Sequence, residues 1–243
     1  WEWRRVLAPA IAQAERGLLV DWFASLKIAA AAPGFARFAT SAATYLVGGH
    51  YAPFTPELGA PLRLKLGRLG DTLRRLAEAG PRDFYEGRIA AALARDLAAG
   101  GSKVTLDDLG RYRARLVEPL AFDYAGVTVN AVPGLSAGPT LQKVLQAIAG
   151  QAGKAPDAAW FTALATALLE AYRERFATMG DSRGEIWSAH FNVVDADGNM
   201  VSLTQTLLSL FGSNVMLQET GIMMNNGLMW IDTRPGRPNS IGA

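Results

Sequence analysis

The amino-acid sequence predicts a layered α/β or α+β fold in which helices pack on strands. Two observations carry this prediction. Apolar residues recur three and four positions apart through residues 1–99, which is the spacing of helices. Residues 116–132 and the final quarter of the chain instead contain strand-like runs. A length of 243 residues, half of them hydrophobic, is ample for one large domain with a substantial core.

The first hundred residues are predicted to be mostly helical. Pro and Gly interrupt the pattern at residues 33–34, 48–49 and 80–81, so we expect separate helices between these breaks. A short helix is expected after Thr105, because a threonine followed three residues later by Asp108 is similar to a capping box.

Strands and then helices are predicted in the middle of the chain. The near alternation of Val, Thr, Phe and Tyr in residues 116–132 indicates two strands joined near residues 125–126. After a turn-rich stretch, helical spacing returns at residues 140–148 and 158–179.

The final quarter is predicted to be sheet. Strand-like runs at residues 190–194 and 200–207 flank the sequence DADGN, which favours a hairpin because Gly and Asn tolerate positive φ and Asp caps its own turn. Residues 221–226 form another strand-like run, and the Pro- and Gly-rich tail from Pro235 is expected to be a loop.

Composition argues against several classes of function. The 24 basic and 22 acidic residues give a formal charge of +2, too balanced for a nucleic-acid-binding surface over the whole chain. The sequence has no cysteine, and His50 and His190 lie too far apart in sequence to suggest a zinc site. The sequence has no run of about eighteen apolar residues free of charges or helix breakers, so no transmembrane helix is predicted. We therefore expect no metal, cofactor, nucleic-acid or membrane partner.

The predicted hairpin gathers hydroxyl side chains on one face. If it closes symmetrically about Asp197, His190 lies opposite Thr204 and Ser188 lies opposite Thr206. The apolar face belongs in a core and carries Phe191, Val193, Val201, Leu203 and Leu207. The polar face carries Ser188, His190, Asn192, Ser202, Thr204 and Thr206.

Ser188 is the candidate nucleophile of this face. A hydroxyl needs a base, but His190 stands only two residues along the same strand and no Gly-x-Ser-x-Gly elbow surrounds Ser188. The other solution makes Ser188 the first residue of a chain, so that its own α-amine, with a pKa of about 7.7–8.0, acts as base. That solution requires cleavage between Trp187 and Ser188.

Residues 188–206, with the sequence SAHFNVVDADGNMVSLTQT, closely resemble the start of the small subunit of the gamma-glutamyltranspeptidases, which are N-terminal-nucleophile hydrolases. Further similarity to the family follows in order along the chain, at residues 80–87, 105–112 and 118–120 and then at residues 211–212, 220–226 and 234–240. The resemblance implies the four-layer αββα sandwich of these hydrolases.

The resemblance also implies a mode of assembly. Residues 1–187 correspond to the large subunit and residues 188–243 to the small subunit of one precursor. Together the two parts form one domain. The resemblance also leaves a homodimer open. Tens of residues are missing relative to the family near residues 181–182. The compartment is unknown, since the family implies a periplasmic or secreted protein and the residues leave a cytoplasmic location open.

The family's function implies an autoprocessing amidohydrolase or acyltransferase that acts on a small-molecule or peptide amide through an acyl-Ser188 intermediate. Ser188 stands where the family has its nucleophilic threonine, and Ala189 replaces the threonine that follows. Thr206 matches the threonine that hydrogen-bonds the nucleophile, and Thr204 is expected to line the site. For His190 a structural role is preferred, because the amine mechanism needs no imidazole.

Three positions depart from the family's substrate contacts. Leu208, Gly227 and Trp230 align with the asparagine, glutamine and aspartate that hold the ends of a gamma-glutamyl group. Because an apolar site cannot pair charged ligand groups, an acyl group less polar than gamma-glutamyl is expected, unless nearby Asp232 or residues outside this sequence compensate.

Two other functions stay open. The replacements at Ser188 and Ala189, with the lost polar contacts, are compatible with a catalytically inactive homologue that acts as a binding or assembly protein. An acylase of the beta-lactam side-chain type differs from the leading hypothesis only in its substrate.

Overall fold

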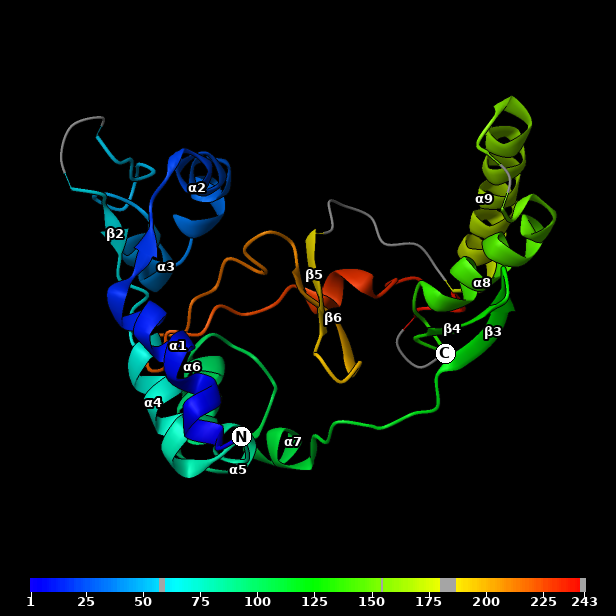
Figure 1. Cartoon of the computed structure of the whole chain (residues 1–243). Helices are drawn as coiled ribbons and strands as arrows, with labels where there is room; N and C mark the ends of the chain where they lie inside the picture. The colour runs from blue at the N-terminus through cyan, green and yellow to red at the C-terminus, as the bar shows by residue number, and fades with distance from the viewer. Residues whose placement is uncertain (57–59, 154, 180–186, 241–243) are drawn as a thin grey trace. The chain divides into compact units, whose positions relative to one another are not determined.

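The computed structural model describes residues 1–56, 60–153, 155–179 and 187–240. The chain divides into two compact units (Figure 1). Unit 1 comprises Trp1–Arg113 and Glu185–Gly227, and unit 2 comprises Ala114–Gly184 and Leu228–Ala243. The predicted division into a large subunit (residues 1–187) and a small subunit (residues 188–243) refers to cleavage of the chain rather than to these compact units. It stays a prediction. The gap predicted near residues 181–182 lies outside the described residues.

The helices of unit 1 confirm the predicted helical character of the first hundred residues. A two-stranded antiparallel pair, β1 (Leu18–Leu19) with β2 (Arg63–Leu64), was not predicted. The helices are α1 (Trp3–Arg16), α2 (Trp22–Phe35), α3 (Ala39–Tyr45), α4 (Leu69–Ala79), α5 (Asp83–Glu86), α6 (Arg88–Ala99) and α7 (Leu106–Arg111).

Local signals set several helix ends in unit 1. The capping box before α7 is confirmed, because the Thr105 side chain accepts from the Asp108 N–H and the Asp108 side chain accepts from the Thr105 N–H. Gly80 ends α4 with φ 86°. The break predicted at residues 33–34 is confirmed within one residue, since α2 ends at Phe35 and α3 begins at Ala39. Pro33 lies in the last turn of α2, and Phe35 is completely buried.

The core of unit 1 joins the early helices to the segment after residue 208. Phe35 stacks on Tyr45 with ring centroids 4.6 Å apart, and Phe211 packs edge-on against Phe35 at 5.0 Å. Met216 is buried in the same cluster. Burial raises the pKa of Tyr45 to about 12.

Residues 209–226 run as an irregular segment, so the strand predicted at residues 221–226 is wrong. The segment contains one isolated bridge, between Met216 and Met223. At Gly221, with φ 68°, a Cβ atom would lie 2.4 Å from the backbone nitrogen of Leu69, so the chain turns there against α4. The apolar run that suggested a strand is used instead for packing against helices, as Ile222 does in the cluster around α6.

Polar contacts hold this segment to the helices. The Ser41 hydroxyl donates to the Asn214 carbonyl at 2.7 Å and accepts from the Met216 N–H at 2.9 Å. The Thr72 hydroxyl donates to the Thr220 carbonyl at 2.7 Å. Since Ser41 is completely buried, these hydrogen bonds satisfy groups that water does not reach.

Unit 2 has the strand pair and helices that the sequence predicts. Strands β3 (Leu120–Tyr124) and β4 (Val127–Ala131) are antiparallel, and Ala125 and Gly126 both have positive φ in the turn. The helical elements are α8 (Gly138–Ala147), the 3₁₀ turn η1 (Ala149–Gln151), α9 (Ala158–Thr178) and the 3₁₀ turn η2 (Gly227–Trp230), whose first residue belongs to unit 1. Val144 and Ile148 pack against α9 in the core of this unit.

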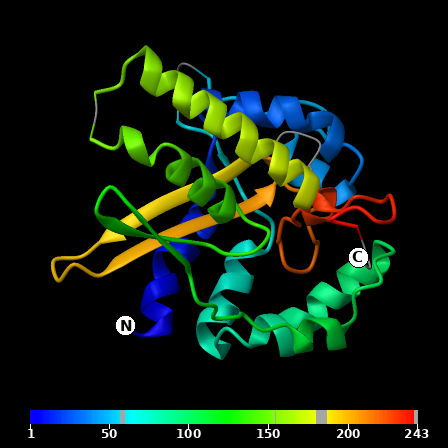
Figure 2. The same cartoon turned by 90° about the vertical axis from the view of Figure 1, so that its right-hand side faces the viewer.

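The hairpin of the final quarter is confirmed in unit 1. Strands β5 (Trp187–Val194) and β6 (Met200–Leu208) pair antiparallel, and Figure 2 shows them side by side with their turn at one end. Asp195 caps the turn by accepting from the Asn199 N–H at 2.8 Å, and Gly198 has φ 82°. Among the described residues, no helix is long and apolar enough to cross a membrane.

The Asp83 carboxylate is a buried structural anion of unit 1. It accepts two hydrogen bonds from Arg75 and one each from the N–H groups of Arg88 and Ile89. The hydrogen bond from Arg75 is the main reason that the pKa of Asp83 lies below its ordinary value.

We predict that Asp83→Ala lowers the free energy of unfolding by about 1–3 kcal/mol, because buried donors lose their acceptor. Because the folded pKa of Asp83 is lowered, its contribution is present above the unfolded pKa of about 3.9 and is lost as pH falls below it. The difference between wild type and variant therefore shrinks at acidic pH. Denaturant unfolding measured at several pH values checks both statements.

The matched control is Asp107→Ala, which removes an exposed carboxylate that pairs with Arg111. Exposed pairs contribute little, so this variant should change stability by less than about 1 kcal/mol. Equal losses from Asp83→Ala and Asp107→Ala would contradict the structural role of Asp83.

Candidate active site

The strand pairing of the hairpin follows the predicted register over most of its length. From the Val194–Met200 pair to the Ala189–Gln205 pair, the partners are those expected for a turn centred on Asp197. The side chains therefore alternate between the two faces as predicted from His190 to the turn.

The register changes at Ser188, where the predicted one-to-one pairing with Thr206 is wrong. Trp187 pairs with Leu208, so Thr206 and Leu207 together lie against Ser188 in a β-bulge. Leu208 has φ 74°, a left-handed conformation that is strained for a branched side chain. A bulge twists the strand and re-aims its side chains, which a symmetric extrapolation from the turn does not include.

The polar face is held together by His190. Its Nδ1 lies 2.7 Å from the Thr204 hydroxyl oxygen, and its Nε2 lies 3.2 Å from Asn192 Oδ1 and 3.4 Å from the Ser202 hydroxyl oxygen. Both imidazole nitrogens thus have partners within the hairpin, away from Ser188. These contacts support the structural role preferred for His190.

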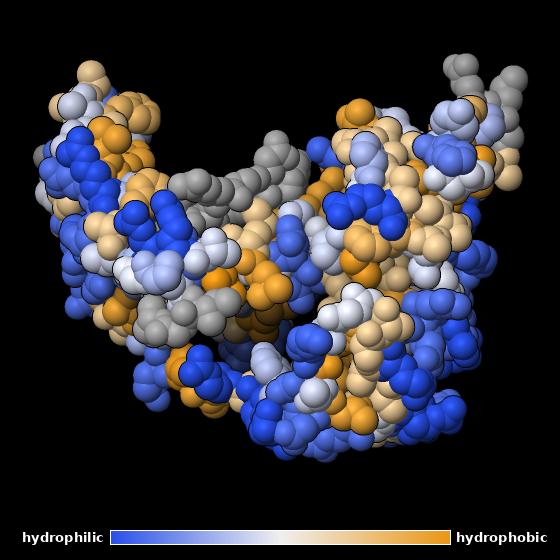
Figure 3. All heavy atoms as spheres, turned by 180° about the vertical axis from the view of Figure 1, so that it is seen from behind, coloured by the Kyte–Doolittle hydropathy of each residue, from blue (hydrophilic) through white to orange (hydrophobic). Residues whose placement is uncertain are grey.

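The apolar face of the hairpin is not buried by the described residues, so the predicted core location is wrong for them. The cores of unit 1 form instead around Phe35 and around Leu93. Figure 3 shows hydrophobic areas among hydrophilic ones on the face that it displays. The exposed fraction is 38–55% for the five predicted side chains, Phe191, Val193, Val201, Leu203 and Leu207.

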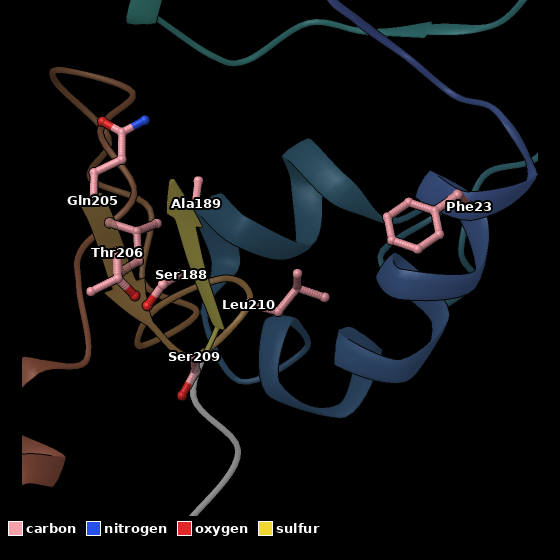
Figure 4. Close-up of a pocket in the computed structure, with 8 residues that line it drawn as sticks. Phe23, Ser188, Ala189, Gln205, Thr206, Ser209 and Leu210 are labelled. Carbon is pink, nitrogen blue, oxygen red and sulfur yellow. The ribbon is translucent and has the colours of Figure 1, made fainter. Parts of the chain in front are cut away.

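Ser188 and Thr206 nevertheless line one pocket, with a volume of ≈ 600 Å³. In Figure 4 their hydroxyl oxygens point toward each other. The Thr206 hydroxyl oxygen also accepts from the Leu208 N–H at 2.7 Å, which ties it to the bulge. The lining residues are Phe23, Ser188, Ala189, Gln205, Thr206, Leu207, Ser209 and Leu210, all of unit 1.

The pocket includes residues that the sequence reasoning missed. Ser209 and Leu210 directly follow β6, so their proximity to Thr206 was available from the chain itself. Phe23 belongs to α2 and carries no local signal of a site. Only the packing of residues 209–226 against the early helices brings such distant residues to one pocket.

Other predicted site residues have different surroundings. Leu208 is buried, with 6% of its surface exposed, and contributes its backbone to the bulge rather than its side chain to the pocket. Thr204 is bound to His190 and does not line the pocket. The Gly227 N–H donates to Asn225 Oδ1 at 2.8 Å. Substrate contacts by these three residues stay predictions.

Trp230 and Asp232 belong to unit 2 and are described within it. Asp232 forms an ion pair with Arg234, and hydrogen bonding from Arg234 is the main cause that lowers the pKa of Asp232. Its negative charge is therefore already paired. A role for either residue in a site with Ser188 stays a prediction.

The pocket is electrically neutral along its described lining. Hydroxyl, amide and hydrocarbon side chains form it, and none of the described lining residues carries a charge. The described residues also contain no cluster of three or more His, Cys, Asp or Glu side chains that would hold a metal ion. The chemistry that this arrangement supports is nucleophilic attack by a hydroxyl.

Comparison with known proteins identifies relatives over the whole chain. The family model described as "Gamma-glutamyltranspeptidase" matches residues 1–188 and 183–243. The chain is 31% identical to the Acylase ACY 1 proenzyme of Pseudomonas sp. (strain V22), over 97% of this chain and 49% of the relative. It is 28% identical to the glutathione hydrolase proenzyme of Escherichia coli (strain K12), over 76% of this chain and 40% of the relative.

Solved structures confirm the fold class. The cephalosporin acylase of Bacillus halodurans matches with a TM-score of 0.81 at 24% identity, over 99% of this chain and 51% of that one. The gamma-glutamyltranspeptidase of Helicobacter pylori matches with a TM-score of 0.64 at 23% identity, over 74% of this chain and 51% of that one. The predicted α/β fold of the N-terminal-nucleophile hydrolases is therefore confirmed. The chain spans about half the length of these curated relatives.

We predict that Thr206→Val lowers the free energy of unfolding by about 1 kcal/mol, because the Leu208 N–H loses its side-chain acceptor at the bulge. Thr206→Ser keeps the hydroxyl and should retain most of the stability. Denaturant unfolding of both variants measures the difference. A Thr206→Val variant as stable as the wild type would show that this hydrogen bond contributes no stability.

Proposed function

The chain belongs to the gamma-glutamyltranspeptidase family, and from this premise we propose that it forms part of an autoprocessing amidohydrolase or acyltransferase with Ser188 as nucleophile. The observation that carries the proposal is the position of Ser188. It lies at the start of β5, where the family's small subunit begins, and lines a pocket together with Thr206.

Processing begins with attack of the Ser188 hydroxyl oxygen on the carbonyl carbon of Trp187. The C–N bond of this peptide breaks, the hydroxyl proton passes to the departing nitrogen, and an ester joins the two residues. Water then hydrolyses the ester, which releases the Trp187 carboxylate and leaves Ser188 with a free α-amine. The relatives named proenzymes support this maturation.

Catalysis then uses the new amine as base. The amine takes the hydroxyl proton while the oxygen attacks the substrate amide, and it passes the proton to the leaving amine. The acyl group is held as an ester on Ser188 until water or an acceptor amine removes it. Thr206 lies against Ser188 and is itself fixed by the Leu208 N–H, which suits a residue that orients the nucleophile.

The cleaved parts stay together through buried contacts. Ser41 and Thr72, which precede the cleavage point, hydrogen-bond to Asn214, Met216 and Thr220, which follow it. The core around Phe35 crosses the same division. Because these contacts do not involve the Trp187–Ser188 peptide bond, its cleavage leaves them intact.

The first test is cleavage. Intact-mass measurement of the freshly purified full-length protein should show two polypeptides divided between Trp187 and Ser188, and native mass measurement should show one complex. Ser188→Ala should remain a single chain, because it lacks the attacking oxygen. Ser188→Thr should still cleave, since it keeps a hydroxyl. A wild-type chain that stays uncleaved after long incubation would count against the proposal.

The second test is the pH dependence of turnover. Only the neutral amine accepts a proton, so kcat/KM should rise with pH up to the amine pKa of about 7.7–8.0 and level off above it. His190→Gln should leave unchanged the pH at which kcat/KM levels off, because the His190 imidazole is bound to Thr204 and Asn192 within the hairpin. If the rise of kcat/KM with pH disappears in His190→Gln, the base is the imidazole instead of the amine.

An acylase of the beta-lactam side-chain type is the second candidate, favoured by the similarity to the Acylase ACY 1 proenzyme. It shares the nucleophile and the mechanism and differs in substrate, so a panel of acyl amides and beta-lactams separates the two. The catalytically inactive alternative predicts that Ser188 is not acylated. Labelling of Ser188 by an electrophilic inhibitor, located by peptide mass spectrometry, rules that alternative out.

A further inference from the structure

We infer that the pocket beside Ser188 binds a neutral, apolar acyl chain, and that Phe23 and Leu210 are specificity-determining residues for it. The inference rests on the proposed role of Ser188 as nucleophile. It adds the class of acyl group and the side chains that select it.

The pocket has two chemically different ends. The hydroxyl groups of Ser188 and Thr206 lie together at one end, whereas Leu210 and Phe23 lie on the other side of the start of β5 in Figure 4. An acyl carbon bound to the Ser188 oxygen starts at the polar end. The rest of its chain extends toward hydrocarbon side chains, where apolar surface is removed from water.

The uncharged side chains of the lining disfavour binding of a gamma-glutamyl group in this pocket. That group carries an ammonium and a carboxylate close together, and neither finds an oppositely charged side chain among the described lining residues. Charged groups that leave water without a partner oppose binding. The pocket volume of ≈ 600 Å³ lies within the usual range for small-molecule sites, so an extended acyl chain fits.

Phe23 is positioned by its neighbours on α2. The Asp21 side chain caps the helix by accepting from the Ala24 N–H at 2.7 Å. Trp22 packs edge-on against the Phe23 ring at 5.7 Å, and Lys27 Nζ lies 5.3 Å from the ring centroid. The ring is thereby held in place although 47% of its surface is exposed.

The charge of Lys27 makes an acyl chain that ends in a carboxylate the most informative substrate to compare with a neutral one. Lys27 lies one turn from Phe23 and does not line the pocket, but its charge would attract a carboxylate at the far end of an acyl chain. A pair of substrates with six acyl carbons each, hexanoyl and adipoyl, differs in this carboxylate and keeps the chain length. The comparison therefore isolates charge from size.

The test measures kcat/KM of the processed full-length enzyme for acetyl, hexanoyl, adipoyl and gamma-glutamyl p-nitroanilides. Hexanoyl should exceed each of the other three by about tenfold or more. Phe23→Ala should lower the hexanoyl value by about tenfold and leave the acetyl value unchanged, because the short group does not reach Phe23. Leu210→Ala should act in the same direction, and Phe23→Leu should restore most of the preference.

The matched control is Leu26→Ala. Leu26 lies on the same helix as Phe23 and is 56% exposed, but it does not line the pocket, so the hexanoyl preference should persist. Faster turnover of adipoyl or gamma-glutamyl than of hexanoyl would overturn the inference. An equal effect of Phe23→Ala on acetyl and hexanoyl would overturn it as well.

Acylation of Ser188 separates this inference from the proposed function. Intact-mass measurement with a reactive acetyl ester reports the nucleophile independently of the apolar end of the pocket. If Ser188 is acylated but the acyl donors are not distinguished, the inference fails and the proposed function stands. If Ser188 is not acylated by any donor, both fail.

Discussion

The packing of residues 209–226 against the early helices is the constraint on which the site depends. Ser41 and Thr72 bind the backbone of this segment, and Met216 enters the core around Phe35. The segment continues directly from β6, so the same contacts fix the end of the hairpin at which Ser188 lies. A hairpin alone is marginally stable in water, and its attachment supplies the fixed position that a nucleophile requires.

The bulge gives this end of the hairpin its irregular geometry. A regular ladder sets one residue against one partner, whereas here Thr206 and Leu207 share the space opposite Ser188. The left-handed conformation of Leu208 belongs to the same distortion, as does the hydrogen bond that its N–H donates to the Thr206 hydroxyl oxygen. Local strain of this kind persists where surrounding structure enforces it, and it often marks a functional position.

The fold was predictable where the signal is local. The capping box at Thr105 and the turn at Asp195 appear as expected, because each depends on hydrogen bonds within a few residues. The strand expected at residues 221–226 does not form, because its apolar side chains pack on helices that are distant in sequence. This error arises where tertiary packing overrides local preference.

The sequence by itself determined the family, the candidate nucleophile and most of the hairpin register, since ordered motifs and a period of two are written in neighbouring residues. Only the tertiary structure decided that Ser188 lies in a bulge and shares a pocket with Phe23 and Leu210. The physical reason is that a pocket depends on contacts between residues far apart along the chain. No local pattern around Phe23 encodes its place beside Ser188.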